Sequence, residues 1–389
     1  MRMSNSQSTR MIRGARPYFD DSEIEEILPG VESILRSGWL ILGEHTAAFE
    51  EEFRRYVGSR YAVAVSSCSA ALQIVLRYYK VDGRDVILPT NNFPGDVSAV
   101  LYEGGTPVLA DMDPATFCID TDDAMRRLTE RTRAVIVTHL AGLVYPDIDR
   151  LRAECAKRGV FLIEDASHAH GAAIGKRKAG SLADAGVFSF YPTKIMTSSV
   201  GGMITTDDEK LAEYARLVRH HGQGKRREDF VSMGSDWCMS EIHAVTGLAQ
   251  LKRLDERVDY RNQLVDWYRQ ELAGADWLEI PRYPAQFRHA YYKLPTIVAE
   301  DVNRDLLRQT LETEFGIQNG TVYDPPCHLQ GAFRELLRIP EGSLPNAERI
   351  LARQLCPPVH TSVTREDVAF VAETMLSVIE RCRVPSRRR

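Results

Sequence analysis

Short apolar runs alternate with longer amphipathic segments from about residue 62 to residue 206. Between the runs, SAALQIVLRYYK (69–80) and DIDRLRAECAKRG (147–159) have helical spacing, and the second ends at Gly159, a helix-stop residue. This alternation predicts an α/β fold, with a mostly parallel central sheet flanked by helices on both faces. The expected strands are AVAVSS (62–67), DVILPT (85–90), TPVLADMD (106–113), AVIVTH (134–139), VFLIEDA (160–166), AGVFSFY (185–191) and GMITT (202–206).

The pattern changes in the C-terminal third of the chain. Residues 241–274, EIHAVTGLAQLKRLDERVDYRNQLVDWYRQELAG, have helical spacing throughout, and a run of this length often links two domains. Beyond about residue 275 proline becomes more frequent, and helical and strand patterns mix. We therefore predict a flexible N-terminus over 1–15, a large domain over 16–255 and a smaller α+β domain over 256–389.

Composition excludes several classes of function. The 389 residues are 44% hydrophobic, which is ample for a packed core, and the net charge of −5 gives no reason to expect nucleic acid or an anionic membrane as a partner. No run of about 18 apolar residues occurs, and the polar N-terminus lacks the apolar region of a signal peptide, so we expect a cytoplasmic protein. The seven cysteines are scattered without a C-x-x-C pair, which predicts neither a disulfide framework nor a metal site.

Candidate chemistry gathers at the ends of three predicted strands, where parallel sheets bind their ligands. Cys68 and Ser69 open a helix whose first N–H groups can bind an anion, although Ser69 alone could be a simple N-cap. Asp165 ends a strand and His168 follows it; a buried carboxylate needs a cationic partner, and the alternative is an N-cap aspartate with a surface histidine. Lys194, in FSFYPTKIMTSSVGG (188–202), is either a sheltered lysine able to form a Schiff base or a lysine at the surface.

Together the three sites match the requirements of pyridoxal 5′-phosphate. The phosphate needs a helix start, the pyridine nitrogen needs a carboxylate that keeps it protonated, and the aldehyde needs a lysine. The sequence therefore predicts a pyridoxal phosphate site in which Lys194 bonds the cofactor and later moves protons.

Longer stretches resemble the DegT/DnrJ/EryC1/StrS family of sugar aminotransferases, which are fold-type I pyridoxal phosphate enzymes. The resemblance runs from about residue 13 to residue 378. It implies a fold-type I architecture and a homodimer in which segment 234–240 reaches the partner's active site. The matching pieces are SGWLILGEHTAAFEEEF, AVAVSSCSAALQIVL, GGTPVLADMDPATFCID, LIEDASHAHGA, FSFYPTKIMTS, GGMITTDDEKLAEYARLVRHHG, MSEIHAVTGLAQLKRLDE and PPCHLQGAF.

The resemblance also implies roles for individual residues. Lys194 matches the Schiff-base lysine, Asp165 the partner of the pyridine nitrogen, and His168 a residue beside the ring near its phenolic oxygen. Phe93 matches the aromatic side chain that stacks on the cofactor ring. The remaining matches are phosphate ligands, Cys68 (through its backbone), Ser69 and Ser189, and residues on the substrate side, Trp39, Tyr323 and His328.

Three positions depart from the family's pattern. Asp236 stands where the family usually has an asparagine that reaches the partner's phosphate, and an ionised carboxylate there would repel the phosphate. Cys238 replaces a common arginine, which removes a natural partner for an anionic substrate group. Val200 replaces an acidic residue or glycine.

These observations predict an aminotransferase that moves an amino group from L-glutamate or L-glutamine to a keto sugar, nucleotide-linked in the favoured reading, or to a related cyclic ketone. One alternative is another pyridoxal phosphate reaction on the same scaffold; the family's dehydratase branch carries histidine in place of the lysine, so Lys194 argues against it. The other is a non-catalytic, cofactor-binding regulatory protein. This alternative would be favoured by Asp236 and Cys238, but it is opposed by the presence of Lys194, Asp165 and His168.

Overall fold

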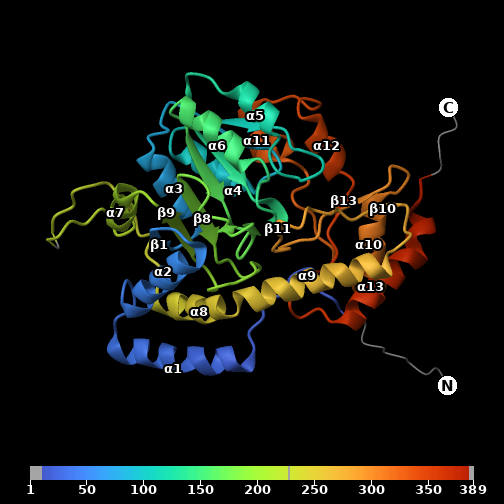
Figure 1. Cartoon of the computed structure of the whole chain (residues 1–389), viewed down its shortest axis with the longest axis horizontal. Coiled ribbons are helices and arrows are strands. Elements are labelled where there is room, and N and C mark those ends of the chain that lie inside the picture. The colour runs from blue at the N-terminus through green and yellow to red at the C-terminus, as the bar shows by residue number, and fades with distance from the viewer. Residues whose placement is uncertain (1–10, 227, 385–389) are drawn as a thin grey trace.

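A seven-stranded sheet forms the centre of the computed structural model, which describes residues 11–226 and 228–384 (Figure 1). Its strand order is β1-β9-β8-β5-β4-β2-β3, and β9 runs antiparallel to its neighbours β1 and β8 while the other pairs are parallel. All seven predicted strands are confirmed, most with trimmed ends. They are β1 (Tyr61–Val65), β2 (Asp85–Pro89), β3 (Thr106–Ala110), β4 (Thr132–Thr138), β5 (Phe161–Asp165), β8 (Ala185–Ser189) and β9 (Gly202–Thr206).

Helices cover both faces of this sheet, because successive strand residues point to opposite sides. Val135 and Val137 of β4 belong to one apolar cluster, and Ala134 and Ile136 belong to the other. The predicted α/β fold is therefore confirmed. The first cluster is completed by α2 (Glu44–Val57), α5 (Thr121–Arg127), α6 (Ile148–Lys157) and α8 (Glu241–Lys252), and the second by α3 (Cys68–Tyr78), α4 (Pro94–Tyr102) and α7 (Glu209–Val218).

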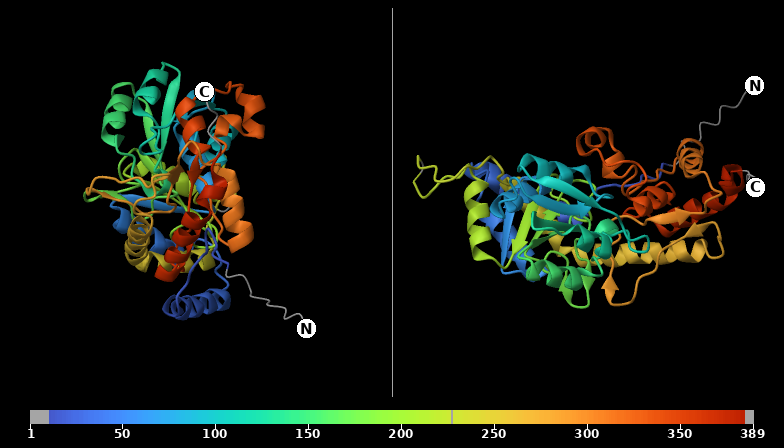
Figure 2. Two further views of the ribbon diagram at one scale, coloured as in Figure 1. Left: turned by 90° about the vertical axis from the view of Figure 1, so that its right-hand side faces the viewer. Right: turned by 90° about the horizontal axis from the view of Figure 1, so that it is seen from above.

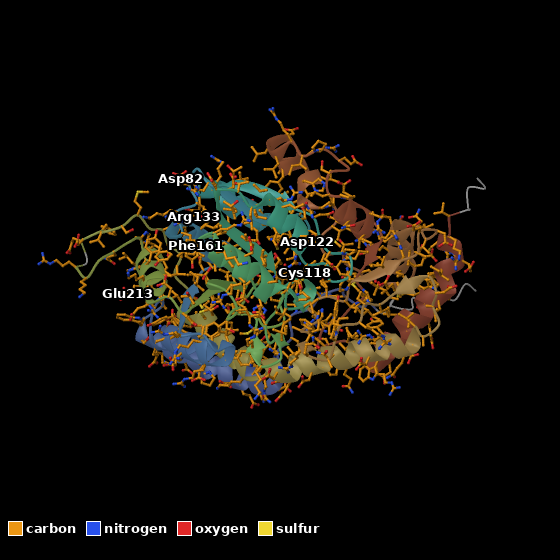
Figure 3. All side chains as sticks on the ribbon, turned by 45° about the horizontal axis from the view of Figure 1, so that its top comes forward. Asp82, Cys118, Asp122, Arg133, Phe161 and Glu213 are labelled. Carbon is orange, nitrogen blue, oxygen red and sulfur yellow. The ribbon has the colours of Figure 1, made fainter. Side chains whose placement is uncertain are left out.

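The edge of the sheet where the parallel strands begin is closed by side-chain stacking. Phe161, at the start of β5, stacks on Tyr79 with ring centroids 3.9 Å apart. The Arg133 guanidinium lies 4.8 Å from the centre of the same Phe161 ring (Figure 3). Ligands are therefore left to the opposite edge, where these strands end.

The long helical run predicted over 241–274 is two helices, α8 and α9 (Leu254–Glu271), which meet at Arg253. The sequence pattern did not predict this break, because the helical spacing of apolar residues continues through the junction. Helix α9 packs along α13 (Arg365–Val378) and leads into a smaller part of the molecule beside the central sheet (Figures 1 and 2). That part contains α10 (Arg304–Phe315) and a sheet of β10 (Leu278–Glu279), β12 (Thr296–Val298) and β13 (Gln354–Leu355).

The chain before the large domain is anchored in two places. Ile12 is buried in the apolar cluster of α9, α10 and α13, and its N–H donates to the Gly316 carbonyl. Helix α1 (Asp21–Ser37) packs against α8 (Figure 1). The prediction of a flexible segment over 1–15 thus falls partly on residues 1–10, outside the described residues, while Ile12 is held in place.

The remaining described elements are short. None of the helices in the described residues combines the length and the apolar character needed to cross a lipid bilayer. The short elements are β6 (Ala173–Ile174), β7 (Arg177–Lys178), β11 (Phe287–Arg288), α11 (Gly331–Leu337), α12 (Pro345–Leu351) and three single-turn 3-10 helices at Leu140–Gly142, Cys327–Leu329 and Ile379–Cys382.

Candidate active site

A cavity of about 400 Å³ lies where β1, β5 and β8 end. It is lined by residues that are up to 256 positions apart in the sequence, from Ser67 to Tyr323. Eight of the eleven predicted site residues line it, and they are Cys68, Ser69, Phe93, Asp165, His168, Ser189, Lys194 and Tyr323.

One wall of the cavity is the start of α3. Ser67 is the N-cap of this helix, since its side chain accepts the Ala70 N–H. The alternative reading of Ser69 as the cap is therefore wrong, and its hydroxyl is free to face the cavity. The N–H groups of Cys68 and Ser69 come before the first intrahelical bonds, so they can bind an anion. Gly202 is needed beside this turn, because a Cβ there would lie 2.4 Å from the Ser67 carbonyl.

Asp165 reaches the cavity because it is the last residue of β5, and Glu164 before it points to the other face. The Glu164 carboxylate accepts N–H groups of Gly180 and Leu182 and pairs with His139 inside the core. Asp165 accepts the Ser167 N–H at 2.9 Å and is 4% exposed. Because successive strand residues point to opposite faces of the sheet, Glu164 is a structural acid in the core and Asp165 faces the cavity.

Lys194 lies in the loop between β8 and β9. Its N–H donates to the Tyr191 carbonyl, and its Nζ lies 4.8 Å from the centre of the Tyr292 ring. Burial would raise the pKa of the Tyr292 hydroxyl, but the charges of Lys194 and Lys293 outweigh that effect and lower it. The lysine is thus sheltered in the cavity, as predicted, and its stem does not lie along the outer surface.

His168 is held in one orientation by three neighbours. The Ala141 N–H donates to its Nδ1 at 3.3 Å, Tyr323 Oη lies 2.8 Å from its Nε2, and its ring stacks on Tyr292 with centroids 4.2 Å apart. Burial, reinforced by the charge of Lys194, holds the pKa of His168 well below its ordinary value. The ring is therefore neutral at pH 7, so His168 is neither a surface histidine nor a cationic partner for Asp165.

These residues fit pyridoxal phosphate. The cavity combines an anion-binding helix start, a strand-end carboxylate and a lysine amine, and the Phe93 ring is half exposed at its mouth. Cys68, Ser69 and Ser189 would hold the phosphate, Asp165 the pyridine nitrogen and Lys194 the aldehyde carbon. The helix start, the carboxylate and the lysine are the three requirements that led to the prediction from sequence, and Phe93 was implied by the family resemblance.

Three predicted residues lie outside the cavity of their own chain. Trp39 is 66% exposed and lines a separate hollow beside Glu241. Asp236 is exposed in the segment that follows α7, where its backbone forms an isolated antiparallel β-bridge with His220. His328 is fully buried: Thr90 Oγ1 lies 2.7 Å from its Nδ1 and Glu348 3.0 Å from its Nε2. A direct substrate contact for His328 would need those partners to move.

Several cavity residues were missed in the sequence. Tyr292 and Thr193 flank the lysine, and Ser167 Oγ lies 3.0 Å from the Cys68 thiol. Asp96 is the most consequential, because it places a second buried carboxyl group near Asp165. Its signal was its place at the start of a helix that follows strand β2, as Ser69 follows β1.

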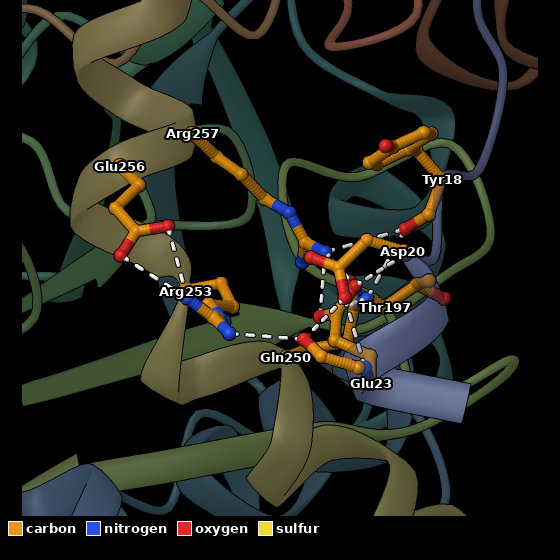
Figure 4. A network of polar contacts seen from close by, with 9 residues as sticks. Tyr18, Asp20, Glu23, Thr197, Gln250, Arg253, Glu256 and Arg257 are labelled. Atoms are coloured by element: carbon orange, nitrogen blue, oxygen red, sulfur yellow. Dashed lines mark hydrogen bonds and ion pairs between the residues drawn. The ribbon is translucent and has the colours of Figure 1, made fainter. Parts of the chain in front are cut away.

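A buried polar network supports the lysine loop from behind (Figure 4). The Thr197 N–H donates to Gln250 Oε1 at 3.2 Å, and Gln250 Nε2 donates to the Glu23 carboxylate at 2.9 Å. Arg257 donates to the same carboxylate at 2.6 Å. The loop is therefore tied through α8 to α1 and α9.

Comparison with known proteins agrees with this geometry. The model of the DegT/DnrJ/EryC1/StrS aminotransferase family matches residues 21–376. A GDP-perosamine synthase of Caulobacter vibrioides is 32% identical, and the match covers 94% of this chain and 97% of that protein. The structure of the putative sugar aminotransferase Spr1654 from Streptococcus pneumoniae in its PLP-form has a TM-score of 0.89, 28% identity, and coverage of 96% of this chain and 100% of that one. DesI in the presence of its TDP-sugar product has a TM-score of 0.87, 30% identity, and coverage of 96% and 94%.

Proposed function

Because the chain belongs to the DegT/DnrJ/EryC1/StrS aminotransferase family, we propose that it moves an amino group from L-glutamate or L-glutamine to the ketone of a nucleotide-linked sugar or a related cyclic ketone. It is a pyridoxal phosphate-dependent aminotransferase, as its relatives are. The observation that carries the proposal is the convergence of Lys194, Asp165 and the start of α3 on one cavity.

The residues divide the work of a transamination between them. When bound, pyridoxal phosphate supplies the electron sink. Lys194 Nζ would hold the aldehyde carbon and, as a free amine, would move the proton of the donor's α-carbon. Asp165 Oδ would stabilise the proton on the pyridine nitrogen, and the start of α3 would hold the phosphate and keep the ring in place.

His168 donates a hydrogen bond to the Tyr323 hydroxyl, which directs the hydroxyl proton of Tyr323 toward the cavity. Since Nδ1 of the neutral ring accepts the Ala141 N–H, the ring proton lies on Nε2 and is donated to Tyr323 Oη. The Tyr323 hydroxyl keeps its own proton, because burial raises its pKa well above the ordinary value. That proton is then free for an acceptor oxygen in the cavity.

Two observations favour a nucleotide-linked acceptor. One relative is a GDP-perosamine synthase, and a similar structure contains a TDP-sugar product. A cavity of about 400 Å³ that also holds the cofactor leaves little space for a nucleotide, which would lie at the mouth, where Phe93, Tyr191 and Val200 are exposed. Exposed apolar side chains at the mouth suit contact with a nucleobase. In contrast, Cys238 stands where the family commonly has an arginine, so that arginine is not there to bind the phosphates of a nucleotide.

We also propose a homodimer with shared active sites. The segment after α7 extends away from the body of the molecule, and it exposes Phe230, Val231 and Met233 (Figure 1). Trp39, Leu40 and Ile41 add a second exposed apolar stretch. Side chains of this kind are expected at an interface. Light scattering after size-exclusion chromatography should give twice 43.9 kDa; a monomer would exclude the shared site.

The visible absorption spectrum tests the reaction. The yellow protein should bleach with L-glutamate or L-glutamine, and its colour should return with a nucleotide-linked keto sugar. The Lys194→Ala variant should lose turnover below detection while remaining folded. Lys176→Ala, which changes an exposed lysine outside the cavity, is the matched control. Undiminished transamination by Lys194→Ala would overturn the assignment.

A further inference from the structure

We propose that Asp96 is a positioning residue that carries a proton at neutral pH and donates it to the Asp165 carboxylate, so that the two acids present a single negative charge to the cavity. The proposal concerns the cofactor site of the aminotransferase and is independent of the identity of the amino donor and acceptor. It adds to the site a residue that no matching motif suggested.

The orientation of Asp96 is fixed by Asn92. The Asn92 Oδ1 accepts the Phe93 N–H at 2.7 Å, so its Nδ2 must be the group that donates to Asp96 Oδ2. Asn92 and Asp96 are both buried, and Asp96 is 3% exposed. Because Oδ2 accepts this bond, the acid proton belongs on Oδ1.

Asp165 is the acceptor of that proton. The Asp165 carboxylate takes the Ser167 N–H at 2.9 Å, and the side chain of Asp96 lies within hydrogen-bonding reach of it. Both groups line the same cavity. Two carboxyl groups in contact can form a hydrogen bond only if one of them is protonated, since two carboxylates are acceptors alone.

The surroundings favour the proton on Asp96. Burial, followed by the adjacent Asp165 charge, raises the pKa of Asp96 well above its ordinary value. The hydrogen bond from Asn92 and then the charge of Lys194 act in the opposite direction, but burial and the Asp165 charge outweigh them. The start of α4 also favours an anion, yet more weakly than a contacting carboxylate opposes it. The other titratable groups that face Asp96 are Cys68, Tyr323 and Cys327, and burial raises the pKa of each, which keeps them neutral.

The consequence is a carboxylate of fixed orientation and charge. Asp165 is held from one side by the Ser167 N–H and from another by the Asp96 hydroxyl, and its remaining capacity faces the cavity. A second ionised acid would instead give the site two negative charges. Since a nearby anion increases the affinity of the pyridine nitrogen for its proton, the pair determines how much charge the cofactor meets.

The test compares Asp96→Asn with Asp96→Thr and the exposed control Asp276→Asn. Asparagine and threonine both keep a donor toward Asp165 but cannot titrate. Infrared difference spectra of the cofactor-free chain at pH 7 should show a protonated-carboxyl band in the wild type and in Asp276→Asn, and its loss in both Asp96 variants. A band of equal intensity in the Asp96 variants, or no such band in the wild type, would overturn the proposal.

The pH dependence of stability gives a second readout. Because the proton of Asp96 is bound more tightly in the folded chain than in the unfolded chain, the wild type loses stability relative to Asp96→Asn as the pH rises above the ordinary aspartate value. The unfolding equilibrium constants should diverge by up to about tenfold per pH unit between pH 5 and pH 8. A constant difference across this range would contradict the proposal. Neither readout involves turnover, so failure of the proposed reaction would leave both unaffected.

The bound cofactor separates positioning from general packing. Asp96→Asn should bind pyridoxal phosphate within a few-fold of the wild type, whereas Asp96→Ala, which leaves Asp165 without that donor, should bind it at least about tenfold more weakly. Equal binding by the asparagine and alanine variants would exclude a positioning role for Asp96.

Discussion

Glu23 and Asp165 are both buried carboxylates, 2% and 4% exposed, but the molecule surrounds them differently. Glu23 lies behind the lysine loop, where Arg257, Gln250 and the Asp20 N–H together occupy both of its oxygens. Asp165 lies at the cavity, where it has a backbone donor and a second acid as its neighbours. The cluster around Glu23 is closed and balanced in charge. The cluster around Asp165 is open toward the cavity and deficient in positive charge.

The difference separates groups that hold the fold from groups that act on a ligand. A structural charge is stable when every lone pair has a donor, because an unpaired buried charge is costly. A functional acid must keep capacity for its ligand, so Asp165 has a second acid, Asp96, and no neutralising arginine as its neighbour. Removing the cation of the Glu23 cluster should therefore lower the stability of the protein. Removing the charge of Asp165 should leave that stability unchanged or improved.

The largest expected effect breaks the closed cluster. Arg257→Met leaves the Glu23 carboxylate buried without its cation, which should lower the free energy of unfolding by about 3–5 kcal/mol. Urea denaturation measures this change. The exposed ion pair of Arg36 and Glu32 provides the control, since Arg36→Met should cost less than about 1 kcal/mol.

A double variant tests whether charge is the cause. Adding Glu23→Gln to Arg257→Met removes the unpaired charge, and it should restore part of the lost stability. If Arg257→Met proves no more harmful than Arg36→Met, the closed cluster contributes little and the contrast with Asp165 disappears.

The next effect appears in catalysis and not in stability. Asp165→Asn keeps the oxygen that accepts the Ser167 N–H but removes the negative charge from the cavity. Turnover should fall about 100-fold, equivalent to about 2.7 kcal/mol of lost transition-state stabilisation. The melting temperature should stay the same or rise, because two neighbouring acids no longer compete for one proton.

The exposed Asp276→Asn variant should change neither quantity in this experiment. A loss of stability in Asp165→Asn comparable to that of Arg257→Met would place both carboxylates in the same structural class.

The two clusters also differ in how far the sequence revealed them. Asp165 and Lys194 follow apolar runs, and the ends of parallel strands mark a ligand site before any coordinates are known. Asp96 required the sheet order, since its helix follows β2 and Asp165 ends β5, with β4 between these strands. Glu23 and Gln250 are 227 residues apart, and no local pattern connects them. The burial of His328 likewise depends on Thr90 and Glu348, which no spacing rule associates with it.

A third buried carboxylate, Glu241, sharpens the comparison because it has no cation and yet is closed. It accepts the N–H groups of Gly43, His45 and Thr46, so it caps α2 from a helix about 200 residues later in the chain. Burial alone would raise the pKa of Glu241, but these hydrogen bonds and that of the Thr46 hydroxyl outweigh it and lower the pKa. Donors alone can thus stabilise a buried charge.

Glu241→Gln should have the smallest of the three effects, a loss of about 1–2 kcal/mol, because the amide presents N–H groups to other donors. Since the folded pKa of Glu241 is depressed, its contribution is present above the unfolded value near 4.5 and is lost as the pH falls through the folded value. The stability difference between wild type and Glu241→Gln should therefore shrink from pH 7 to pH 4, whereas the exposed control Glu312→Gln should show no such trend. A difference that grows on acidification would mean that Glu241 is held as the neutral acid, in the manner proposed for Asp96, and that hydrogen-bond donors without a cation do not suffice to bury a charge in this protein.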